Sequence, residues 1–448
     1  MPDLYYIDTM GCQMNERDSE TMAGVLEALG LLPAEKPEDA RVALLNTCAV
    51  REKPEHKMFS RLGELAILKQ QRPNMVIGVC GCMAQIGVDE IRKRAPFVDI
   101  IIGPRNIGSL GEAVSKALMS PVVTVATDLD ETPDDTQTPA RTPGLTAFVN
   151  ITYGCDNFCA YCIVPYARGR EISRPVEEVV AEVEGLVADG YREVTLLGQN
   201  VNSYKGGEGE PGSWDREAGT TSGGDFAVLL RRLGQIEGLW RLRFTTSHPK
   251  DLSEQVLRAM AETPSVCEHL HLPLQAGSDK VLKRMGRGYT IKHYKRLVKL
   301  AREIVPEISI TTDVMVGFPG ETDAQFEQTM RAFHEIRFDQ AFMFKYSDRP
   351  GTVAEKLPEK IGGPAKQERL ARLVALQNKV SREINVAQVG QEFEVLVEGR
   401  DTKSPEKLRG RTRQNKMMIF PSADDTLIGQ RVTVRATEGY LWGYVGEL

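Results

Sequence analysis

Apolar residues in the first 120 positions fall into short runs separated by segments with helical periodicity. Each run is rich in β-branched or aromatic residues, as buried strands are. The apolar runs occupy residues 4–7, 42–46, 75–79 and 98–102. In the segment 18–30, apolar positions recur at helical spacing at Met22, Val25, Leu26 and Leu29. This alternation predicts an open α/β domain with a mostly parallel sheet over residues 1–120.

A second alternation of strands and helices begins near residue 145. The predicted strands occupy residues 147–152, 193–198, 242–246, 269–274, 308–316 and 340–346. Helical patterns separate them at residues 176–189, 251–262, 290–304 and 323–336. Because these strands are almost continuously apolar, six strand–helix units favour an incomplete parallel (βα)6 barrel over a flat sheet. A Gly-rich insertion at residues 204–224 interrupts the pattern and is expected to be mobile.

The C-terminal residues have the pattern of a small all-β barrel. Candidate strands joined by turns occupy residues 392–399, 417–420 and 431–439. The expected domains are therefore 1–120, 145–376 and 377–448. Residues 121–144 are rich in Pro, Thr and Asp and are expected to link the first two domains.

The composition is that of a globular protein. The chain has 448 residues, of which 41% are hydrophobic and 26% charged, and its formal net charge is −6. The first residues lack the basic and apolar regions of a signal peptide, and no apolar run is long enough to predict a membrane span. We therefore expect a cytoplasmic protein without a membrane partner. Disulfides are rare in that compartment, so the eight cysteines of the chain are expected to be metal ligands or buried thiols.

Three cysteines lie close together directly after the first predicted barrel strand. Residues 153–162 read YGCDNFCAYC, which spaces Cys155, Cys159 and Cys162 as C-x3-C-x2-C. A closed structural zinc site would require a fourth protein ligand, and none lies nearby in the sequence. A [4Fe–4S] cube held by three thiolates would keep one iron open to a substrate or cosubstrate. The barrel position favours the cube, because active sites lie at the carboxyl ends of barrel strands; a zinc knuckle is the alternative.

Three more cysteines each follow a different strand of the N-terminal sheet. Cys12, Cys48 and Cys82 come after the first, second and third predicted strands. Ligands of open parallel sheets gather at the carboxyl ends of the strands, so these thiols are expected to meet at one edge. The alternative is that they are scattered small hydrophobic residues. Cys80 and Cys267 are expected to be buried and structural, although Cys80 lies beside a candidate ligand.

The barrel motif resembles that of the radical S-adenosylmethionine (SAM) enzymes. The resemblance rests on the C-x3-C-x2-C spacing, with the aromatic Tyr161 just before the last cysteine. It implies that the open iron binds SAM and that reductive cleavage of SAM yields a 5′-deoxyadenosyl radical. Residues 316–321, VGFPGE, resemble the glycine motif that contacts SAM in this superfamily. The candidate SAM contacts at strand ends are Tyr161, Gln199, Asn200, Ser247, Gln275, Gly317 and Gly320.

The whole chain resembles the methylthiotransferases within this superfamily. The resemblance rests on TMGCQMNERDSE (9–20), NTCAVREKPEHK (46–57), GCMAQ (81–85) and YGCDNFCAYCIVPYARGREISRP (153–175). It implies an N-terminal methylthiotransferase domain, a radical SAM barrel and a C-terminal TRAM domain that binds RNA. It also implies two [4Fe–4S] clusters, one on Cys12, Cys48 and Cys82 and one on Cys155, Cys159 and Cys162. LLGQNVNSY (196–204), with the second of these motifs, favours the branch that acts on isopentenyladenosine in tRNA.

The resemblance implies a reaction that consumes two SAM molecules. One methylates a sulfur on the open iron of the N-terminal cluster, and the other yields the radical that removes hydrogen from C2 of N6-isopentenyladenosine next to the anticodon. The expected partners are the tRNA anticodon stem-loop, SAM, an electron donor and a sulfur source, and the chain is expected to act as a monomer. Alternatives within the family are methylthiolation of threonylcarbamoyladenosine in tRNA or of a ribosomal-protein aspartate. A non-catalytic iron–sulfur RNA-binding or sensor protein is the alternative of another class.

Two basic segments are candidate RNA contacts within this acidic chain. Residues 280–302 contain nine Lys or Arg and no Asp or Glu, and residues 400–416 contain seven basic and two acidic residues. A solvated helix face is an equally good explanation of the first segment. The residues expected to contact RNA are Lys283, Arg284, Arg287, Arg409, Arg411, Arg413 and Lys416. The target base must also leave its stack to reach the barrel.

Overall fold

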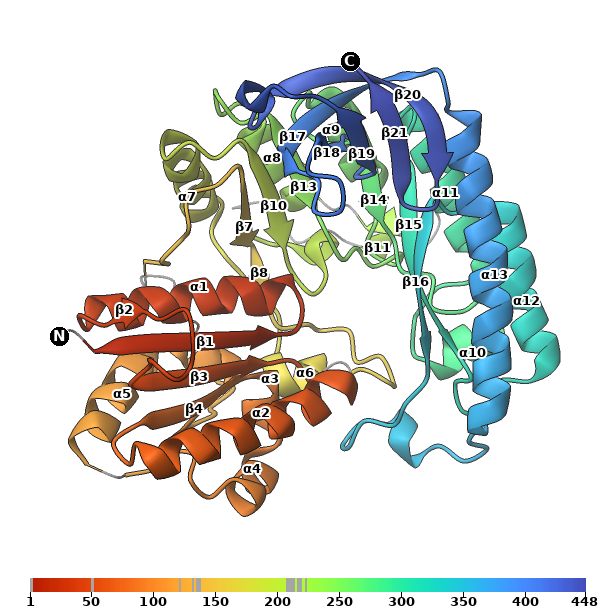
Figure 1. Ribbon diagram of the computed structural model, residues 1–448. Helices are drawn as coiled ribbons and strands as arrows, with labels where there is room; N and C mark the ends of the chain where they lie inside the picture. The colour runs from red at the N-terminus through yellow and green to blue at the C-terminus, as the bar shows by residue number, and fades with distance from the viewer. Residues whose placement is uncertain are drawn as a thin grey trace.

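The computed structural model shows three regions, arranged as an N-terminal α/β layer, a central half-open barrel and a C-terminal β-barrel (Figure 1). The structure describes residues 3–49, 52–120, 122–130, 133, 138–206, 214–215, 220–221 and 224–448. Most of the Gly-rich insertion that we expected to be mobile lies outside these residues. Within the described ranges, none of the helices combines the length and apolar character needed to cross a membrane.

The N-terminal sheet is parallel and has the strand order β2-β1-β3-β4-β5-β6. Its strands are β1 (Leu4–Met10), β2 (Leu32–Pro33), β3 (Val42–Thr47), β4 (Val76–Gly81), β5 (Ile100–Ile102) and β6 (Thr124–Ala126). Its helices are α1 (Gln13–Ala28), α2 (Glu52–Gln71), α3 (Cys82–Ile86), α4 (Val88–Arg94) and α5 (Leu110–Met119). Strands β3 and β4 are buried at every position, because one apolar core lies on each face of the sheet. This explains why both strands are almost continuously apolar.

The segment predicted to be a linker contributes a strand to this sheet. Strand β6 pairs in parallel with β5 through Ile100↔Thr124, Ile101↔Val125 and Ile102↔Ala126. Two residues of β6 are β-branched, which suits a strand even in a segment rich in Pro and Asp. The N-terminal sheet therefore extends beyond residue 120.

The central region is an incomplete barrel of six parallel strands, as predicted. Its two halves are the sheets β13-β10-β7 and β14-β15-β16, which meet at the bridge Leu242↔Val266. The strands are β7 (Thr146–Asn150), β10 (Glu193–Leu197), β13 (Arg241–Phe244), β14 (His269–His271), β15 (Ser309–Val316) and β16 (Gln340–Lys345). The covering helices are α7 (Val176–Ala188), α8 (Gly224–Leu233), α9 (Glu254–Glu262), α10 (Asp279–Arg284), α11 (Ile291–Ile304) and α12 (Asp323–Ile336).

The C-terminal region is a closed five-stranded barrel with the order β17-β18-β19-β21-β20. Its strands are β17 (Glu392–Arg400), β18 (Lys407–Thr412), β19 (Met417–Pro421), β20 (Arg431–Tyr440) and β21 (Gly443–Glu447). The long helix α13 (Gly363–Ala387) precedes it and runs through residue 377, where the sequence predicted a domain boundary. In Figure 1, α13 lies against β16 of the central barrel and reaches the C-terminal barrel. The boundary was hard to predict because one helix packs on both regions.

The C-terminal barrel closes the end of the central barrel at which the strands begin. The side chain of Arg241, the first residue of β13, donates a hydrogen bond of 2.6 Å to the Arg411 carbonyl oxygen. Arg243 donates to the carbonyl oxygens of Thr412 and Arg413 at 2.9 and 2.8 Å. The opposite end of the central barrel, where the strands finish, is left for the N-terminal region and the cysteine loop.

Candidate active site between two cysteine trios

The barrel trio, Cys155, Cys159 and Cys162, lies in the loop after β8 (Thr152–Tyr153). Cys155 and Cys159 are buried and Cys162 is partly buried. Backbone hydrogen bonds hold the loop, from Cys155 N to the Gly169 carbonyl at 3.1 Å and from Cys162 N to the Cys159 carbonyl at 2.9 Å. Burial raises the pKa of Cys155 to about 11 and that of Cys162 to about 12. A bound metal would therefore have to displace protons from these thiols.

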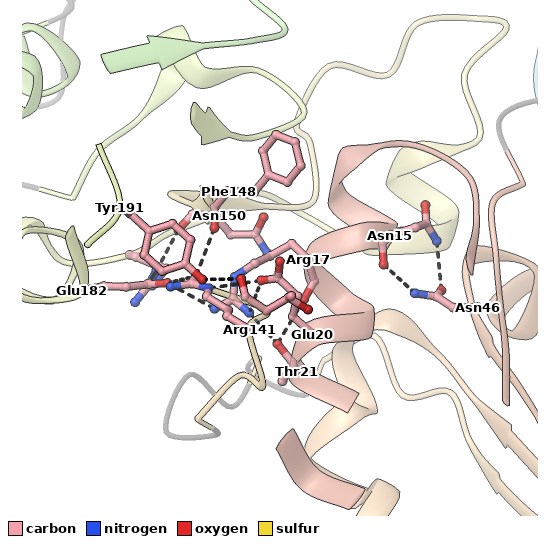
Figure 2. Close-up of polar contacts among 12 residues, drawn as sticks. Asn15, Arg17, Glu20, Thr21, Asn46, Arg141, Phe148, Asn150, Glu182 and Tyr191 are labelled. Carbon is pink, nitrogen blue, oxygen red and sulfur yellow. Dashed lines mark hydrogen bonds and ion pairs between the residues drawn. The ribbon is translucent and has the colours of Figure 1, made fainter. Parts of the chain in front are cut away.

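The N-terminal trio, Cys12, Cys48 and Cys82, is assembled from three strand ends, as expected. All three residues line one cavity of about 250 Å³. A hydrogen bond with Cys48 and the positive charge of Arg168 lower the pKa of Cys12 to about 6. Two fully buried asparagines brace the site, because Asn15 Nδ2 donates to Asn46 Oδ1 at 3.0 Å and the Cys12 thiol donates to Asn15 Oδ1 at 3.4 Å. Figure 2 shows this asparagine pair, with Asn15 on helix α1 and Asn46 on β3.

The structure separates Cys82 from its neighbour Cys80. Cys80 lies in β4 and packs in the core with Met22 and Ile102, whereas Cys82 begins α3 and lines the cavity. Burial raises the pKa of Cys80 to about 12. Cys267 is also buried, and its backbone N–H donates to the Leu242 carbonyl of β13 at 3.0 Å. Both placements match the expected structural role of these two cysteines.

Each trio offers three thiols, which suits a [4Fe–4S] cube with one open iron. Among the described residues, no three His, Cys, Asp or Glu side chains are gathered closely enough to hold one metal ion. A cube spreads its thiolates over different irons, so they lie farther apart than the ligands of a single ion. The donor type, the trio count and the cavity beside the N-terminal trio therefore fit cubes better than zinc.

The cavity beside the N-terminal trio is shared with the central barrel. Its barrel lining includes Gln199 after β10, Thr245 and Thr246 after β13, and Asp313 of β15. Thr246 has a φ of +68°, which is rare for a β-branched residue and marks a strained turn. The Gln199 amide nitrogen lies 2.7 Å from Met14 Sδ of helix α1. The N-terminal cysteines thus face the carboxyl ends of the barrel strands across one space.

A buried arginine from the barrel loop completes the N-terminal site. Arg168 ends helix α6 (Val164–Arg168), which begins two residues after Cys162. Its guanidinium forms a 2.7 Å ion pair with Asp18 of α1, and the two side chains are 3% and 5% exposed. Arg168 also lines the cavity of the three cysteines. The loop that carries the barrel trio is therefore anchored inside the N-terminal region.

A network of charged residues fixes the N-terminal region against helix α7 (Figure 2). The Glu182 carboxylate pairs with Arg17 at 3.2 Å, Arg141 at 2.6 Å and Arg174 at 2.6 Å. Burial would raise the pKa of Glu182, but the three arginines together lower it. Arg141 also pairs with Glu20 at 3.1 Å, so α1 is joined to the barrel through two carboxylates. We call these five residues the Glu182 clamp.

At the strand ends where SAM is expected to bind, some side chains have free polar atoms and others are already hydrogen-bonded. Ser247 Oγ and His248 Nε2 are buried and have no hydrogen-bond partner among the described residues. Burial lowers the pKa of His248 well below its usual value. Because His248 Nδ1 accepts from Lys250 N at 3.1 Å, the neutral ring carries its proton on Nε2 as an available donor. In contrast, Asn200 donates to Asp251 Oδ2 at 2.7 Å and accepts from His248 N at 3.1 Å, so its amide shapes the loop.

The remaining predicted contacts shape the mouth through their backbones and rings. Gly317 and Gly320 have φ values of +73° and +74°, and a side chain at Gly320 would overlap Arg284. Gln275 has a φ of +66° at the end of its loop, and Tyr161 packs edge-on against Phe318 with ring centroids 6.5 Å apart. These residues follow several different barrel strands, and their role as SAM contacts stays a prediction.

Comparison with known proteins identifies the family. Residues 149–333 match the Radical SAM superfamily, residues 4–103 match Uncharacterized protein family UPF0004, and residues 386–445 match the TRAM domain. The chain is 45% identical over 448 residues to the tRNA-2-methylthio-N(6)-dimethylallyladenosine synthase of Carboxydothermus hydrogenoformans, with 99% of each chain covered. It is 47% identical to the enzyme of that name from Moorella thermoacetica, covering 99% of this chain and 98% of the relative.

The chain belongs to the tRNA-2-methylthio-N(6)-dimethylallyladenosine synthase family. The resemblance stated from the cysteine motifs is thereby confirmed. The fold of the synthase also resembles that of the radical S-adenosylmethionine methyltransferase TsrM from Kitasatospora setae, with a TM-score of 0.54 at 15% identity. That match covers 79% of this chain and 77% of TsrM. It supports the predicted fold class of the synthase.

Part of the predicted RNA surface is wrong. In the synthase, Arg287 is 6% exposed and donates to Cys159 Sγ at 3.4 Å and to the Pro273 carbonyl at 3.2 Å. Lys416 is 8% exposed and pairs with Asp339 at 2.8 Å. Arg413 binds Glu268 bidentately at 2.7 and 2.8 Å. Arg413 and Lys416 hold the protein together because the turn after β18 packs on the central barrel, whereas Arg287 is held beside Cys159 by the loop after α10.

The other predicted RNA contacts remain on the surface to different degrees. Lys283 and Arg284 are exposed on α10, although Arg284 also donates to the Pro319 carbonyl at 2.8 Å. Arg411 is partly exposed and pairs with Glu398 at 3.1 Å, and Arg409 is partly buried. Lys283 and Arg284 follow β14 at the open end of the barrel, so they stay the better placed of the predicted contacts.

Sequence patterns missed several residues of the synthase site. Arg287 and Asp313 have no motif that distinguishes them from surface charges, and Glu182 lies on a helix of ordinary composition. Arg168 lies within the quoted motif of residues 153–175, but no role was assigned to it. Only their burial and partners reveal them. One signal was present for Arg287, which lies between two glycines in a segment without acidic residues. That pattern was interpreted as an RNA contact because a buried arginine looks identical in sequence.

Proposed function

We propose that this chain methylthiolates C2 of N6-dimethylallyladenosine next to the anticodon of tRNA, with the barrel trio and the N-terminal trio each holding one [4Fe–4S] cluster. The observation that carries the proposal is the single cavity that Cys12, Cys48 and Cys82 share with Thr245 and Asp313 of the barrel. A base placed there would lie beside the N-terminal cysteines and against residues that follow the barrel strands. When bound, the clusters and two SAM molecules supply the hydrogen-abstraction and sulfur-transfer chemistry.

The residues of the chain prepare the site for this chemistry. Arg168 and Arg287 each place a buried positive charge beside one trio. Such charges stabilise thiolates and the anionic clusters that they hold. Ser247 Oγ and His248 Nε2 are available to polar groups of SAM at the barrel mouth. Cys48, Cys82, Cys155 and Cys159 are buried, which limits the access of water to the two sites.

The proposal extends to the setting of the reaction. The target base belongs to tRNA, so the protein is placed in the cytoplasm. An electron donor and a sulfur source must come from outside the chain, since no described residue supplies reducing equivalents. One chain contributes the three N-terminal cysteines and the barrel residues that line the shared cavity, and it also carries the barrel trio, so a monomer is sufficient.

Nucleoside analysis tests the proposal against its alternatives. Reconstituted protein should convert prenylated tRNA to the 2-methylthio nucleoside and release 5′-deoxyadenosine. A deletion strain should lack 2-methylthio-N6-dimethylallyladenosine and keep the methylthiolated forms of threonylcarbamoyladenosine and ribosomal protein. If the protein forms no 5′-deoxyadenosine under these conditions, a non-catalytic iron–sulfur protein becomes the better interpretation. If 5′-deoxyadenosine forms and the tRNA is unchanged, methylthiolation of a ribosomal protein becomes the better interpretation.

A further inference from the structure

Strand β16 carries an aromatic side chain that the described chain covers only in part. Phe342 is 48% exposed although it lies within a barrel strand. Its neighbours Ala341 and Met343 point the opposite way, into the apolar core shared with the outer helices. Side chains alternate along a strand, so Phe342 faces the interior of the barrel. A large apolar ring exposed at such a position needs a partner.

Two polar side chains flank this ring. Phe342 is paired in register with Asp313 of β15, and its ring centroid lies 5.9 Å from that of His271 of β14. His271 Nε2 is 3.5 Å from Asp313 Oδ1, and His271 Nδ1 is 2.9 Å from Thr311 Oγ1. The Asp313 side chain keeps 31% of its surface exposed. We call Phe342, His271 and Asp313 the Phe342 face.

The Phe342 face adjoins the cavity of the N-terminal trio. Asp313 lines that cavity together with Cys12, Cys48 and Cys82. Phe342 lies one strand farther, directly beside Asp313. A planar group stacked on Phe342 would therefore extend its edge past Asp313 toward the three cysteines.

We propose that the Phe342 face binds the target adenine, which stacks on the Phe342 ring while the Asp313 carboxylate accepts a hydrogen bond from the N6–H group. This inference rests on the proposed function and names the subsite that it requires. Aromatic rings stack with the π face of any base. The carboxylate makes the site selective for a base with a hydrogen-bond donor at its edge. Adenine presents such a donor at N6 and keeps one N6–H after prenylation. His271 holds the carboxylate in place through its contact with Asp313.

Variants that keep or remove the aromatic ring at position 342 distinguish stacking of the base from simple filling of space. Reconstituted Phe342→Ala and Phe342→Leu should lower kcat/KM for prenylated tRNA by about 10-fold or more, whereas Phe342→Tyr should stay within about 3-fold of wild type. Asp313→Leu should lower kcat/KM for prenylated tRNA more than Asp313→Asn does, because asparagine keeps an acceptor oxygen. Leu32→Ala is the matched control, since Leu32 is 49% exposed at the distant edge of the N-terminal sheet, and it should behave as wild type.

Two readouts separate the adenine of tRNA from the adenine of SAM. The KM for SAM and tRNA-independent formation of 5′-deoxyadenosine should stay at wild-type values in Phe342→Ala. Anisotropy with a prenylated anticodon stem-loop RNA should show weaker binding to this variant, without any turnover. The proposal is overturned if Phe342→Leu matches wild type or if only the KM for SAM changes. The anisotropy measurement tests the Phe342 face even if wild type forms no methylthiolated product. That outcome would overturn the proposed function and not the binding proposal.

Discussion

The two cysteine trios have the same composition but are assembled from different parts of the chain. Cys155, Cys159 and Cys162 belong to one loop whose own backbone hydrogen bonds set their spacing. Cys12, Cys48 and Cys82 come from three loops and meet only because parallel strands end at one edge of a sheet. The barrel site is thus local in sequence, whereas the N-terminal site depends on the whole sheet.

Each trio has one buried arginine, and the origin of that arginine sharpens the difference. Arg287 reaches Cys159 from the loop after α10, within the same barrel. Arg168 reaches the N-terminal site from the barrel loop and pairs there with Asp18. The N-terminal site is therefore complete only when the barrel is docked on it, whereas the arginine of the barrel site comes from the barrel itself.

Replacing single cysteines should give the largest effects and separate the two sites. Cys155→Ala is expected to abolish both 5′-deoxyadenosine and methylthiolated tRNA, because SAM would lose its iron site. Cys12→Ala, Cys48→Ala and Cys82→Ala should keep 5′-deoxyadenosine formation and lose the methylthio product. Liquid chromatography with mass detection measures both products. Normal yields of methylthiolated tRNA from Cys12→Ala would refute the division of labour.

Breaking the ion pair between Arg168 and Asp18 should damage only the N-terminal site. Arg168→Gln leaves the Asp18 carboxylate buried without its cation, which should cost about 3–5 kcal/mol of unfolding free energy. Iron should be lost from the N-terminal trio while 5′-deoxyadenosine formation persists. Urea unfolding and iron analysis measure these effects. The double variant Asp18→Asn with Arg168→Gln removes both charges and should recover part of the stability; no recovery would contradict a direct pair.

Removing the central charge of the Glu182 clamp should cause a smaller loss, which affects the methylthio product more than 5′-deoxyadenosine. Glu182→Gln removes the charge that three arginines share, so the two regions should dock less firmly and less product should form per 5′-deoxyadenosine. Glu177→Gln is the control on the same helix, because its pair with Arg232 is exposed and worth little. If the two variants give the same product ratio, the clamp has no role in docking.

The lowered pKa of Glu182 gives the clamp a defined pH dependence. A carboxyl group with a depressed folded-state pKa adds stability above its ordinary pKa and loses it as the pH falls through the folded value. The product ratio of wild type should therefore not change near neutral pH on account of Glu182. Acid unfolding of wild type should begin at lower pH than that of Glu182→Gln, as circular dichroism can measure.

Cys80→Ala should have the smallest effect of all. Cys80 is buried in the core, so its loss should cost about 1 kcal/mol of stability and leave both products unchanged. Cys82→Ala, two residues away, should lose the methylthio product. Equal losses from the two variants would show that the N-terminal ligand was assigned to the wrong strand position.

The sequence predicted what depends on period and spacing. The strand positions of both α/β regions, the barrel trio and the strand-end placement of the N-terminal trio all follow from such local patterns. The family confirmed the fold class. Pairings between distant charges left no local trace, so the roles of Arg168, Arg287 and Glu182 emerged only from burial and partners. For the same reason Arg287 and Lys416 were assigned to RNA, since a sequence does not distinguish a buried cation from an exposed one.

Iron analysis of anaerobically reconstituted protein tests most directly whether the chain holds two independent three-thiolate sites. The account predicts about eight irons per chain in wild type and about four in each of two triple variants, one lacking Cys12, Cys48 and Cys82 and the other lacking Cys155, Cys159 and Cys162. About four irons in wild type, or loss of all iron from either triple variant, would contradict it.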